Sequence, residues 1–393
     1  MTRPLDGITV LSLEHAVAAP FATRQLADLG ARVIKVERPG SGDFARKYDK
    51  RVRGEASYFV WLNRSKESLT LDLKHPQAQR ILSELLPLTD VLVQNLAPGA
   101  AERLNLSAAT LRPRYDRLIL CDISGYGSSG PYRDKKAYDL LIQAEAGLLS
   151  VTGTPDEVAR AGISVADIAA GMYAYSAILA ALIQRGRTGN ASHIEVSLFD
   201  SLIEWMGNPI YYGFEGQAPP PRVGASHPSI YPYGPFLTGD GKAVFLGLQN
   251  EREWGVFCGE VLERPEIATD SRFDTNPRRS ANRAVLQDLI QDLFRDLTAE
   301  QVIARLEAAR IGNARVNEIR DLWEHAQLRA RDRWAQVMSP VGSLPTLKPP
   351  AQIDSFEYRF DPIPALGEHT EDILSALGYS ASQIERLRTE RVI

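Results

Sequence analysis

A stretch without any charged side chain, residues 168–184, constrains the fold more than any other feature of the sequence. It reads IAAGMYAYSAILAALIQ and directly follows Asp167. A helix that is apolar on every side belongs in a packed interior. The stretch only reaches the lower limit of a membrane span, about 17 to 25 residues, and its tyrosines and glutamine are unfavourable in lipid. We therefore predict a buried helix over residues 168–185.

Asp167 stands where this helix should begin, and two interpretations are open. As an N-cap, its carboxylate would accept backbone N–H groups of the first turn. As a functional group, it would face a cleft and be kept ionised by the helix dipole and by amide donors. The segment alone favours the cap, so the choice depends on the rest of the chain.

Composition indicates an ordinary soluble protein. At 393 residues the chain exceeds one typical core, so two lobes are expected. Apolar residues make up 44% and charged residues 24%, and the net charge of −4 gives no sign of nucleic-acid binding. Cys121 and Cys258 are too few and too distant for a disulfide framework or a metal site. No signal peptide is recognised, so we predict a cytoplasmic protein with no metal and no membrane or nucleic-acid partner.

The fold class follows from alternating strand and helix patterns. Apolar runs at residues 7–13 and 31–37 flank a helical segment at 20–29, which predicts a βαβ unit with parallel strands. Four more strands are expected, at residues 68–73, 91–95, 117–124 and 193–198. This alternation predicts an α/β fold with a doubly wound, mostly parallel, Rossmann-like sheet. The first turn lacks G-x-G-x-x-G, which argues against a bound NAD or FAD.

Domain limits are suggested by a shift in composition. From about residue 213 the chain becomes rich in glycine, proline and aromatic residues. We predict a large α/β domain over residues 1–220, a smaller α+β domain over 221–330 and a C-terminal segment over 331–393. A single helix is expected over residues 135–149.

Short motifs occur in a specific order along nearly the whole chain. They are Pro4-Leu-x-Gly-Ile-x-Val-Leu, Val33-Ile-Lys-Val-Glu-Arg-Pro-Gly-x-Gly-Asp43, Lys66-x-Ser-Leu-x-Leu-x-Leu-Lys74, Leu92-Val-x-Asn95, Ala137-Tyr-Asp139, the Asp167 segment and Gly367-Glu-His-Thr. In this order and spacing they resemble the class III CoA-transferases, the family of formyl-CoA transferase and carnitine CoA-transferase. The resemblance implies an obligate, interlocked homodimer, and a C-terminal segment that returns to the large, CoA-binding domain.

The resemblance also implies a mechanism centred on Asp167. Its carboxylate would attack the thioester of an acyl-CoA donor, giving a mixed anhydride and CoA thiolate. The thiolate would then form an aspartyl-CoA thioester, which the acceptor carboxylic acid resolves. Acyl-CoA is a substrate in this scheme, and no cofactor is permanently bound.

Family position further suggests residues that bind CoA. Val17 and Ala18 would lie near the thioester, and Arg38 near the adenosine. The remaining members of the set are Leu71, Leu73, Lys74, Asn95, Leu96, Arg103, Lys136 and Tyr138. The alternative for each cation is a solvated surface charge.

The chain departs from the family pattern at two places. Formyl-CoA transferase has a run of glycines in its small lobe, and here the segment from Gly224 to Tyr233 stands instead. Within it, His227 either faces the acyl group or is a structural hydrogen-bonding residue. Val17 replaces a glutamine common in the family, which leaves backbone amides as candidates for the oxyanion site.

The turn around His15 and the basic loop over residues 46–53 look like the branch that handles C4 and C5 dicarboxylates. In that branch the acceptors are itaconate, mesaconate, citramalate or malate, and succinyl-CoA is a usual donor. His15 and Arg46 are candidates to hold the second carboxylate, or they simply pair with neighbouring acids.

Other functions remain open at this stage. The α-methylacyl-CoA racemases share the fold and the aspartate but have a histidine at the position of Tyr138, and a tyrosine with a pKa of about 10 is a poor base. The acceptor of a transferase could instead be carnitine, formate or oxalate, or an aromatic acid. A protein that binds CoA without catalysis is a third class.

Overall fold

A computed structural model of the chain describes residues 2–393. These residues form two compact units. The first runs to Ala146 and also includes Ala161–Met206 and Arg329–Ile393, while the second comprises Gly147–Arg160 and Gly207–Leu328. The sequence-based limits of 1–220, 221–330 and 331–393 stay a prediction.

The first unit is built on a six-stranded sheet in the order β3-β2-β1-β4-β5-β6, and neighbouring strands are all parallel. The strands are β1 (Thr9–Leu13), β2 (Arg32–Glu37), β3 (Lys66–Thr70), β4 (Val91–Gln94), β5 (Ile119–Ser124) and β6 (His193–Ser197). The predicted α/β fold with a parallel sheet is therefore confirmed. The apolar runs form strands because side chains on both faces of a parallel sheet are covered.

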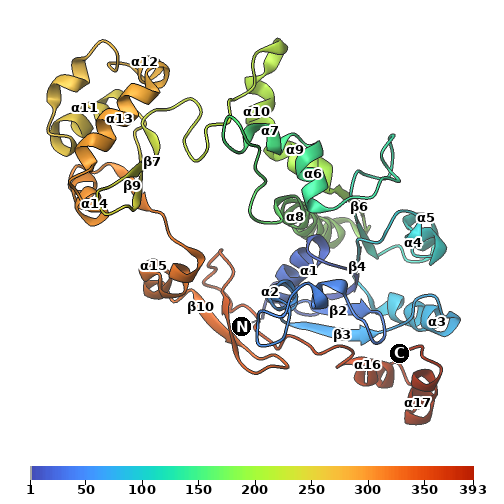
Figure 1. The fold of residues 1–393 in the computed structure, drawn as a ribbon. Helices are drawn as coiled ribbons and strands as arrows, with labels where there is room; N and C mark the ends of the chain where they lie inside the picture. The colour runs from blue at the N-terminus through green and yellow to red at the C-terminus, as the bar shows by residue number, and fades with distance from the viewer. Residues whose placement is uncertain (1) are drawn as a thin grey trace. The chain divides into compact units, whose positions relative to one another are not determined.

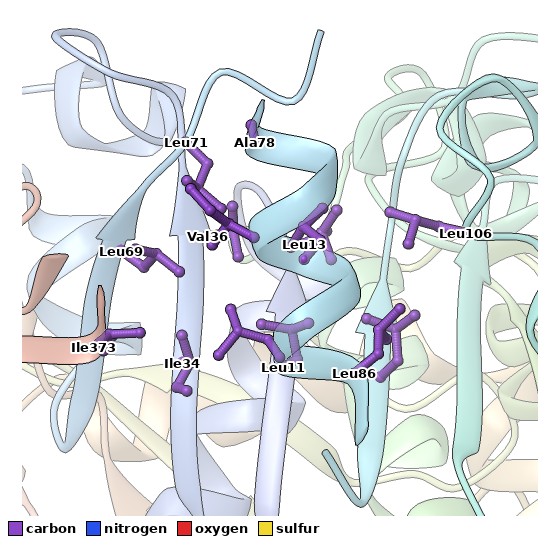
Figure 2. Packing of buried hydrophobic residues seen from close by; sticks show 14 of the residues in the cluster. Leu11, Leu13, Ile34, Val36, Leu69, Leu71, Ala78, Leu86, Leu106 and Ile373 are labelled. Carbon is purple, nitrogen blue, oxygen red and sulfur yellow. The ribbon is translucent and has the colours of Figure 1, made fainter. Parts of the chain in front are cut away.

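One face of this sheet carries a large apolar core. Leucine, isoleucine and valine side chains of β1, β2 and β3 pack under α3 (Pro76–Leu85) (Figure 2). The C-terminal helices, red in Figure 1, complete this core: α16 (Thr370–Ala376) lies beside β3, and α17 (Ala381–Thr389) packs against α16. The end of the chain thus packs against strands formed near its beginning.

The opposite face is covered by α1 (Ala18–Asp28), which packs against α8 (Val165–Thr188). The predicted helix is found, but its burial on every side is wrong for the single chain. Met172 and Ile183 are 39% and 59% exposed, and together with Ser176 and Ala180 they form one stripe along α8. Within residues 2–393, α8 is also the one helix long and apolar enough to cross a membrane, a test that core helices of soluble proteins pass as well.

The remaining elements of the first unit are shorter. They are α2 (Ser57–Leu62), α4 (Ala100–Arg103), α5 (Ala108–Leu111), α6 (Asp139–Glu145), α9 (Leu198–Trp205) and the hairpin β10 (Trp334–Val337) with β11 (Leu344–Leu347). The single helix predicted over residues 135–149 is wrong. Gly147 has a φ of 80°, and this left-handed residue separates α6 from α7 (Leu148–Val151).

The second unit has its own apolar core around an antiparallel sheet of β7 (Tyr233–Leu237), β8 (Ala243–Gly247) and β9 (Gly312–Arg315). Its helices are α7, α10 (Gly207–Tyr212), α11 (Glu251–Val256), α12 (Asn276–Ala281), α13 (Arg283–Phe294) and α14 (Ala299–Ala308). The helix α15 (Ala326–Ala330) spans the limit between the units. Cys121 and Cys258 are both buried and free, and they belong to different units.

Candidate active site

Asp167 lies in the first turn of α8, as the third residue of the helix. The N-cap is Ser164, whose side chain makes no capping hydrogen bond. The N–H groups of Ala166 and Asp167 instead donate to Oδ1 of Asp139, at 2.8 and 3.4 Å. The interpretation of Asp167 as the N-cap is therefore wrong, because a carboxylate from α6 takes that role.

The ionisation of Asp167 also differs from the sequence-based expectation. Burial, and secondly the neighbouring carboxylate of Asp139, raise the pKa of Asp167 to about 7. We expected amide donors to keep this group ionised, but within residues 2–393 its carboxylate accepts no hydrogen bond. The first-turn donors are bonded to Asp139, so burial and like charge dominate.

Gly171 brings the start of α1 close to Asp167. A Cβ atom at Gly171 would lie 2.6 Å from the carbonyl oxygen of Ala18, so only glycine permits this approach of the two helices. Gly171 is one turn after Asp167 on α8, and Val17 is the N-cap of α1, with no side-chain capping bond. Val17 and Ala18 thus begin the helix that crosses α8 one turn from Asp167, and within residues 2–393 no side chain caps this helix start.

The turn before α1 is held in an unusual conformation. Ala16 has a φ of 60°, and its N–H donates to Oδ1 of Asp43 at 3.1 Å. Asn95 bonds both backbone groups of His15, the residue before Ala16. Its Oδ1 accepts the N–H of His15 and its Nδ2 donates to the His15 carbonyl, both at 2.9 Å. Two side chains from other strand ends therefore fix the backbone that leads into α1.

Beneath this turn lies a network of fully buried charges. Lys66 donates to Oε1 of Glu14 at 2.6 Å, and Lys35 donates to Oδ2 of Asp43 at 2.8 Å and to Glu14 at 3.3 Å. Burial alone would raise the pKa of Glu14, but the ammonium groups of Lys66 and Lys35 lower it to about 2. Lys66 also donates to the carbonyl of Pro20, so the network reaches the first turn of α1.

An aromatic cluster between the His15 turn and Asp167 is a feature that sequence reasoning missed. His15 stacks on Phe44, which contacts Tyr48, which contacts Tyr58 in turn. Tyr58 reaches the hydroxyl of Ser164 at 3.4 Å. Burial and the carboxylates of Asp43 and Asp167 raise the pKa of Tyr48 to about 12. The signal in the sequence was the set of aromatic residues within the basic loop and α2.

The residues predicted to bind CoA follow the carboxyl ends of successive strands, the edge where open α/β sheets bind ligands. In chain order they are Arg38 after β2; Leu71, Leu73 and Lys74 after β3; Asn95, Leu96 and Arg103 after β4; and Lys136 and Tyr138 after β5. The four cations of this set are exposed. The side chain of Leu71, by contrast, is 1% exposed and belongs to the apolar core.

Three candidates for the acceptor site differ in their surroundings. Arg46 forms a two-point ion pair with Glu37, at 2.8 and 2.7 Å, so its guanidinium is already engaged. Nδ1 of His15 is buried and unbonded, and lies 3.9 Å from Asp43. Nδ1 of His227, in the second unit, accepts the N–H groups of Ser229 and Ile230. His227 thus organises its own turn, while His15 retains bonding capacity.

Within residues 2–393 no group of three or more histidine, cysteine, aspartate or glutamate side chains is arranged to hold a metal ion.

Comparison with known proteins defines the family. The model of CoA-transferase family III matches residues 5–370. The chain is 35% identical to the succinyl-CoA:glutarate CoA-transferase of Mus musculus, over 100% of this chain and 90% of that protein. It is 31% identical to the succinyl-CoA–D-citramalate CoA-transferase of Chloroflexus aurantiacus, over 100% and 98% of the two chains.

A solved structure agrees with these relatives. The crystal structure of a CAIB/BAIF family protein from Brucella suis superposes with a TM-score of 0.86 and 32% identity, and the match covers 96% of this chain and 100% of that one. The chain belongs to CoA-transferase family III, and it is a CoA-transferase.

Proposed function

We propose that this enzyme moves CoA from succinyl-CoA to a C4 or C5 dicarboxylate, through a covalent aspartyl-CoA thioester on Asp167. The observation that carries the proposal is the crossing of α8 and the start of α1 one helical turn after Asp167. The two helices cross at Gly171, where only hydrogen fits against the carbonyl of Ala18. A nucleophile and a set of backbone N–H donors therefore meet at the carboxyl edge of the sheet.

The chemistry proceeds in balanced steps. An Asp167 oxygen attacks the thioester carbonyl, the C–S bond breaks, and its electron pair leaves on sulfur as CoA thiolate. The thiolate attacks the Asp167 carbonyl carbon and releases the donor acid as its carboxylate. The acceptor carboxylate then repeats the two steps in reverse order and leaves as the new acyl-CoA. No net proton is transferred, so Asp167 must begin as a carboxylate.

The N–H groups of Val17 and Ala18 are suited to the oxyanion that forms at the attacked carbonyl. Both residues are buried, and no side chain caps the helix start. The charged network under the turn holds these donors in place before substrate arrives, and preorganised donors stabilise charge as it develops. The exposed cations Arg38, Lys74 and Lys136 would meet the CoA phosphates.

The acceptor class is supported by the relatives and by His15. The relatives, by their names, use succinyl-CoA with glutarate and with D-citramalate. Both acceptors, and the succinate released from the donor, are short dicarboxylic acids. Burial lowers the pKa of His15 despite the nearby Asp43, which favours the neutral imidazole in the free enzyme. A substrate carboxylate beside the ring would favour its protonation and gain a charge-assisted hydrogen bond. Arg46 is the weaker candidate because Glu37 already occupies it.

We also propose that the enzyme is a homodimer that acts in the cytoplasm, where CoA thioesters are made and used. The exposed stripe of α8 around Met172 and Ile183 supports an interface, because large apolar residues on a central helix are normally covered. Light scattering at micromolar protein tests the assembly, and a stable folded monomer would contradict it.

The function is tested with Asp167→Ala and a panel of acceptors. The variant should fold, bind CoA and transfer none of it, because its only loss is the nucleophile. For the wild-type enzyme with succinyl-CoA, glutarate, citramalate, malate, mesaconate and itaconate should give higher kcat/KM than carnitine, oxalate or benzoate. If carnitine, oxalate or benzoate gave a higher kcat/KM than all five, the acceptor class would be rejected. Racemisation of a 2-methylacyl-CoA without an acceptor would instead favour the racemase branch.

A further inference from the structure

A carboxylate that the reaction scheme does not use lies directly beside the candidate nucleophile. Asp139 is the first residue of α6, and its Oδ1 accepts the N–H groups of Ala166 and Asp167 at 2.8 and 3.4 Å. A side chain of one helix thus caps another helix, although Ser164 stands at the N-cap and is able to do so.

The orientation of Asp139 is fixed from its other side. Its Oδ2 accepts a hydrogen bond from Nε2 of Gln143 at 2.7 Å, one turn further along α6. Gln143 is 0% exposed, and its Oε1 accepts the N–H of Ala161 at 2.9 Å. Both oxygens of Asp139 are therefore occupied, and the segment that leads into α8 is tied to α6 at two points.

We propose that Asp139 is a positioning residue for Asp167: it takes up the amide donors of the first turn of α8 and holds a fixed negative charge beside the nucleophile. This inference rests on the proposed role of Asp167 and assigns the neighbouring carboxylate a part in the same step. Without Asp139, those amides would be free to bind the Asp167 carboxylate itself, and an oxygen that accepts strong hydrogen bonds is a weaker nucleophile.

The electrostatic consequence agrees with this geometry. Burial and then Asp139 raise the pKa of Asp167 to about 7. The elements packed against α8 carry other ionisable groups: Arg24 and Asp28 on α1, Glu145 on α6, Asp200 and Glu204 on α9, Asp122 on β5, and His193 and Glu195 on β6. The phenols of Tyr48 and Tyr58 lie near the start of α8. Several of these charges are paired: Arg24 with Asp28, His193 with Asp122, and Glu145 with Lys135, which precedes α6. Asp139 is the charge that faces Asp167.

The pH dependence of kcat/KM for succinyl-CoA tests the proposal, because it reports ionisation of the free enzyme. Wild type should gain activity as Asp167 loses its proton, with a midpoint of about 7. Asp139→Asn keeps an oxygen for the amides but removes the charge, and should lower the midpoint by about one pH unit. At pH 6 each enzyme reaches a fraction of its own plateau kcat/KM. This fraction should be about five-fold larger for Asp139→Asn than for wild type.

Three further variants keep the test decisive. Asp139→Ser is also neutral and should lower the midpoint if the asparagine disturbs Gln143. Asp139→Glu retains the charge and should keep the wild-type midpoint with a lower plateau. Glu145→Gln is the matched control, since this carboxylate lies on the same helix but pairs with Lys135 at 2.7 Å, and it should change neither quantity.

The inference is overturned if the neutral variants titrate with the same midpoint as wild type. It is equally overturned if Asp139→Glu shifts the midpoint as far as Asp139→Asn does, since the charge would then be irrelevant. Failure of the proposed function is separate: in that case wild type would form no CoA adduct on Asp167 at any pH.

Discussion

Along β1, β2 and β3 the two faces of the central sheet are both largely buried but differ in chemistry. On one face, residues such as Leu11 and Ile34 are 0% and 2% exposed and belong to one apolar cluster. On the other, Glu14, Lys35 and Lys66 are 0 to 3% exposed and bond one another. Apolar burial is non-directional and gives stability. Buried ion pairs give little net stability, but they fix directions, and here they fix the turn that leads into α1.

Breaking the charged face should give the largest loss of stability. Glu14→Gln leaves the ammonium groups of Lys35 and Lys66 without their shared carboxylate, and loss of one partner in a buried ion pair costs about 3 to 5 kcal/mol. Chemical unfolding would measure the loss. Glu67→Gln is the matched control on an exposed pair with Arg32, and it should cost under about 1 kcal/mol. Equal losses would remove the distinction between the two kinds of ion pair.

Breaking the apolar face should give a similar or smaller loss without a catalytic effect. Leu11→Ala deletes buried methyl groups under α3 and should cost about 2 to 5 kcal/mol. The kcat of Leu11→Ala per folded enzyme should stay within about two-fold of wild type, which is about the error of such assays. Glu14→Gln, by contrast, should reduce kcat more than about ten-fold. Steady-state rates corrected for the folded fraction decide this. A large drop in kcat for Leu11→Ala would show that the two faces share one role.

Asp167 should destabilise the fold as pH rises. Its folded pKa of about 7 lies above the ordinary value of 3.8, so the folded state binds the extra proton between these limits. Stability is therefore lost as pH rises from about 4 to 7. Asp167→Asn should be near neutral at pH 4 and stabilising by about 1 to 3 kcal/mol at pH 8. Unfolding curves at both pH values measure the difference, and an equal effect at both would contradict the raised pKa.

The smallest effect on stability is expected at the turn itself. Ala16→Gly removes the strain of an alanine at φ 60° but adds freedom to the unfolded chain, so the net change should be under about 1 kcal/mol. The looser turn should lower kcat several-fold while KM for succinyl-CoA changes little. A variant with wild-type kcat would show that the bond from Ala16 to Asp43 does not matter for catalysis.

Much of the fold could be predicted from local patterns. The apolar runs predicted all six parallel strands, and the absence of charge over residues 168–184 predicted α8. The exposure of Met172 and Ile183 was not predictable, because an apolar stripe looks the same whether it faces its own core or an interface. The break at Gly147 was missed because a glycine within a helical pattern is also compatible with a continuous helix.

The site was predicted less completely than the fold. Asp167 and the turn around Val17 were predicted through the resemblance. Asp139 belongs to the motif Ala137-Tyr-Asp139, yet nothing local shows that its carboxylate accepts the N–H of Ala166, which lies 27 residues later in the sequence. The choice between substrate binding and an acid partner for Arg46 was left open by the sequence, because the pairing with Glu37 depends on how β2 and the following loop fold back on each other. Such pairings are set by tertiary structure and leave no periodic signal.

The covalent adduct on Asp167 tests the account most directly. Enzyme incubated with succinyl-CoA and no acceptor is quenched, digested and analysed by mass spectrometry. The account predicts that the peptide containing Asp167 gains the mass of a CoA thioester, that hydroxylamine removes it, and that Asp167→Ala shows no gain. Turnover with an acceptor while Asp167 stays unmodified, or an adduct on another residue, would contradict it.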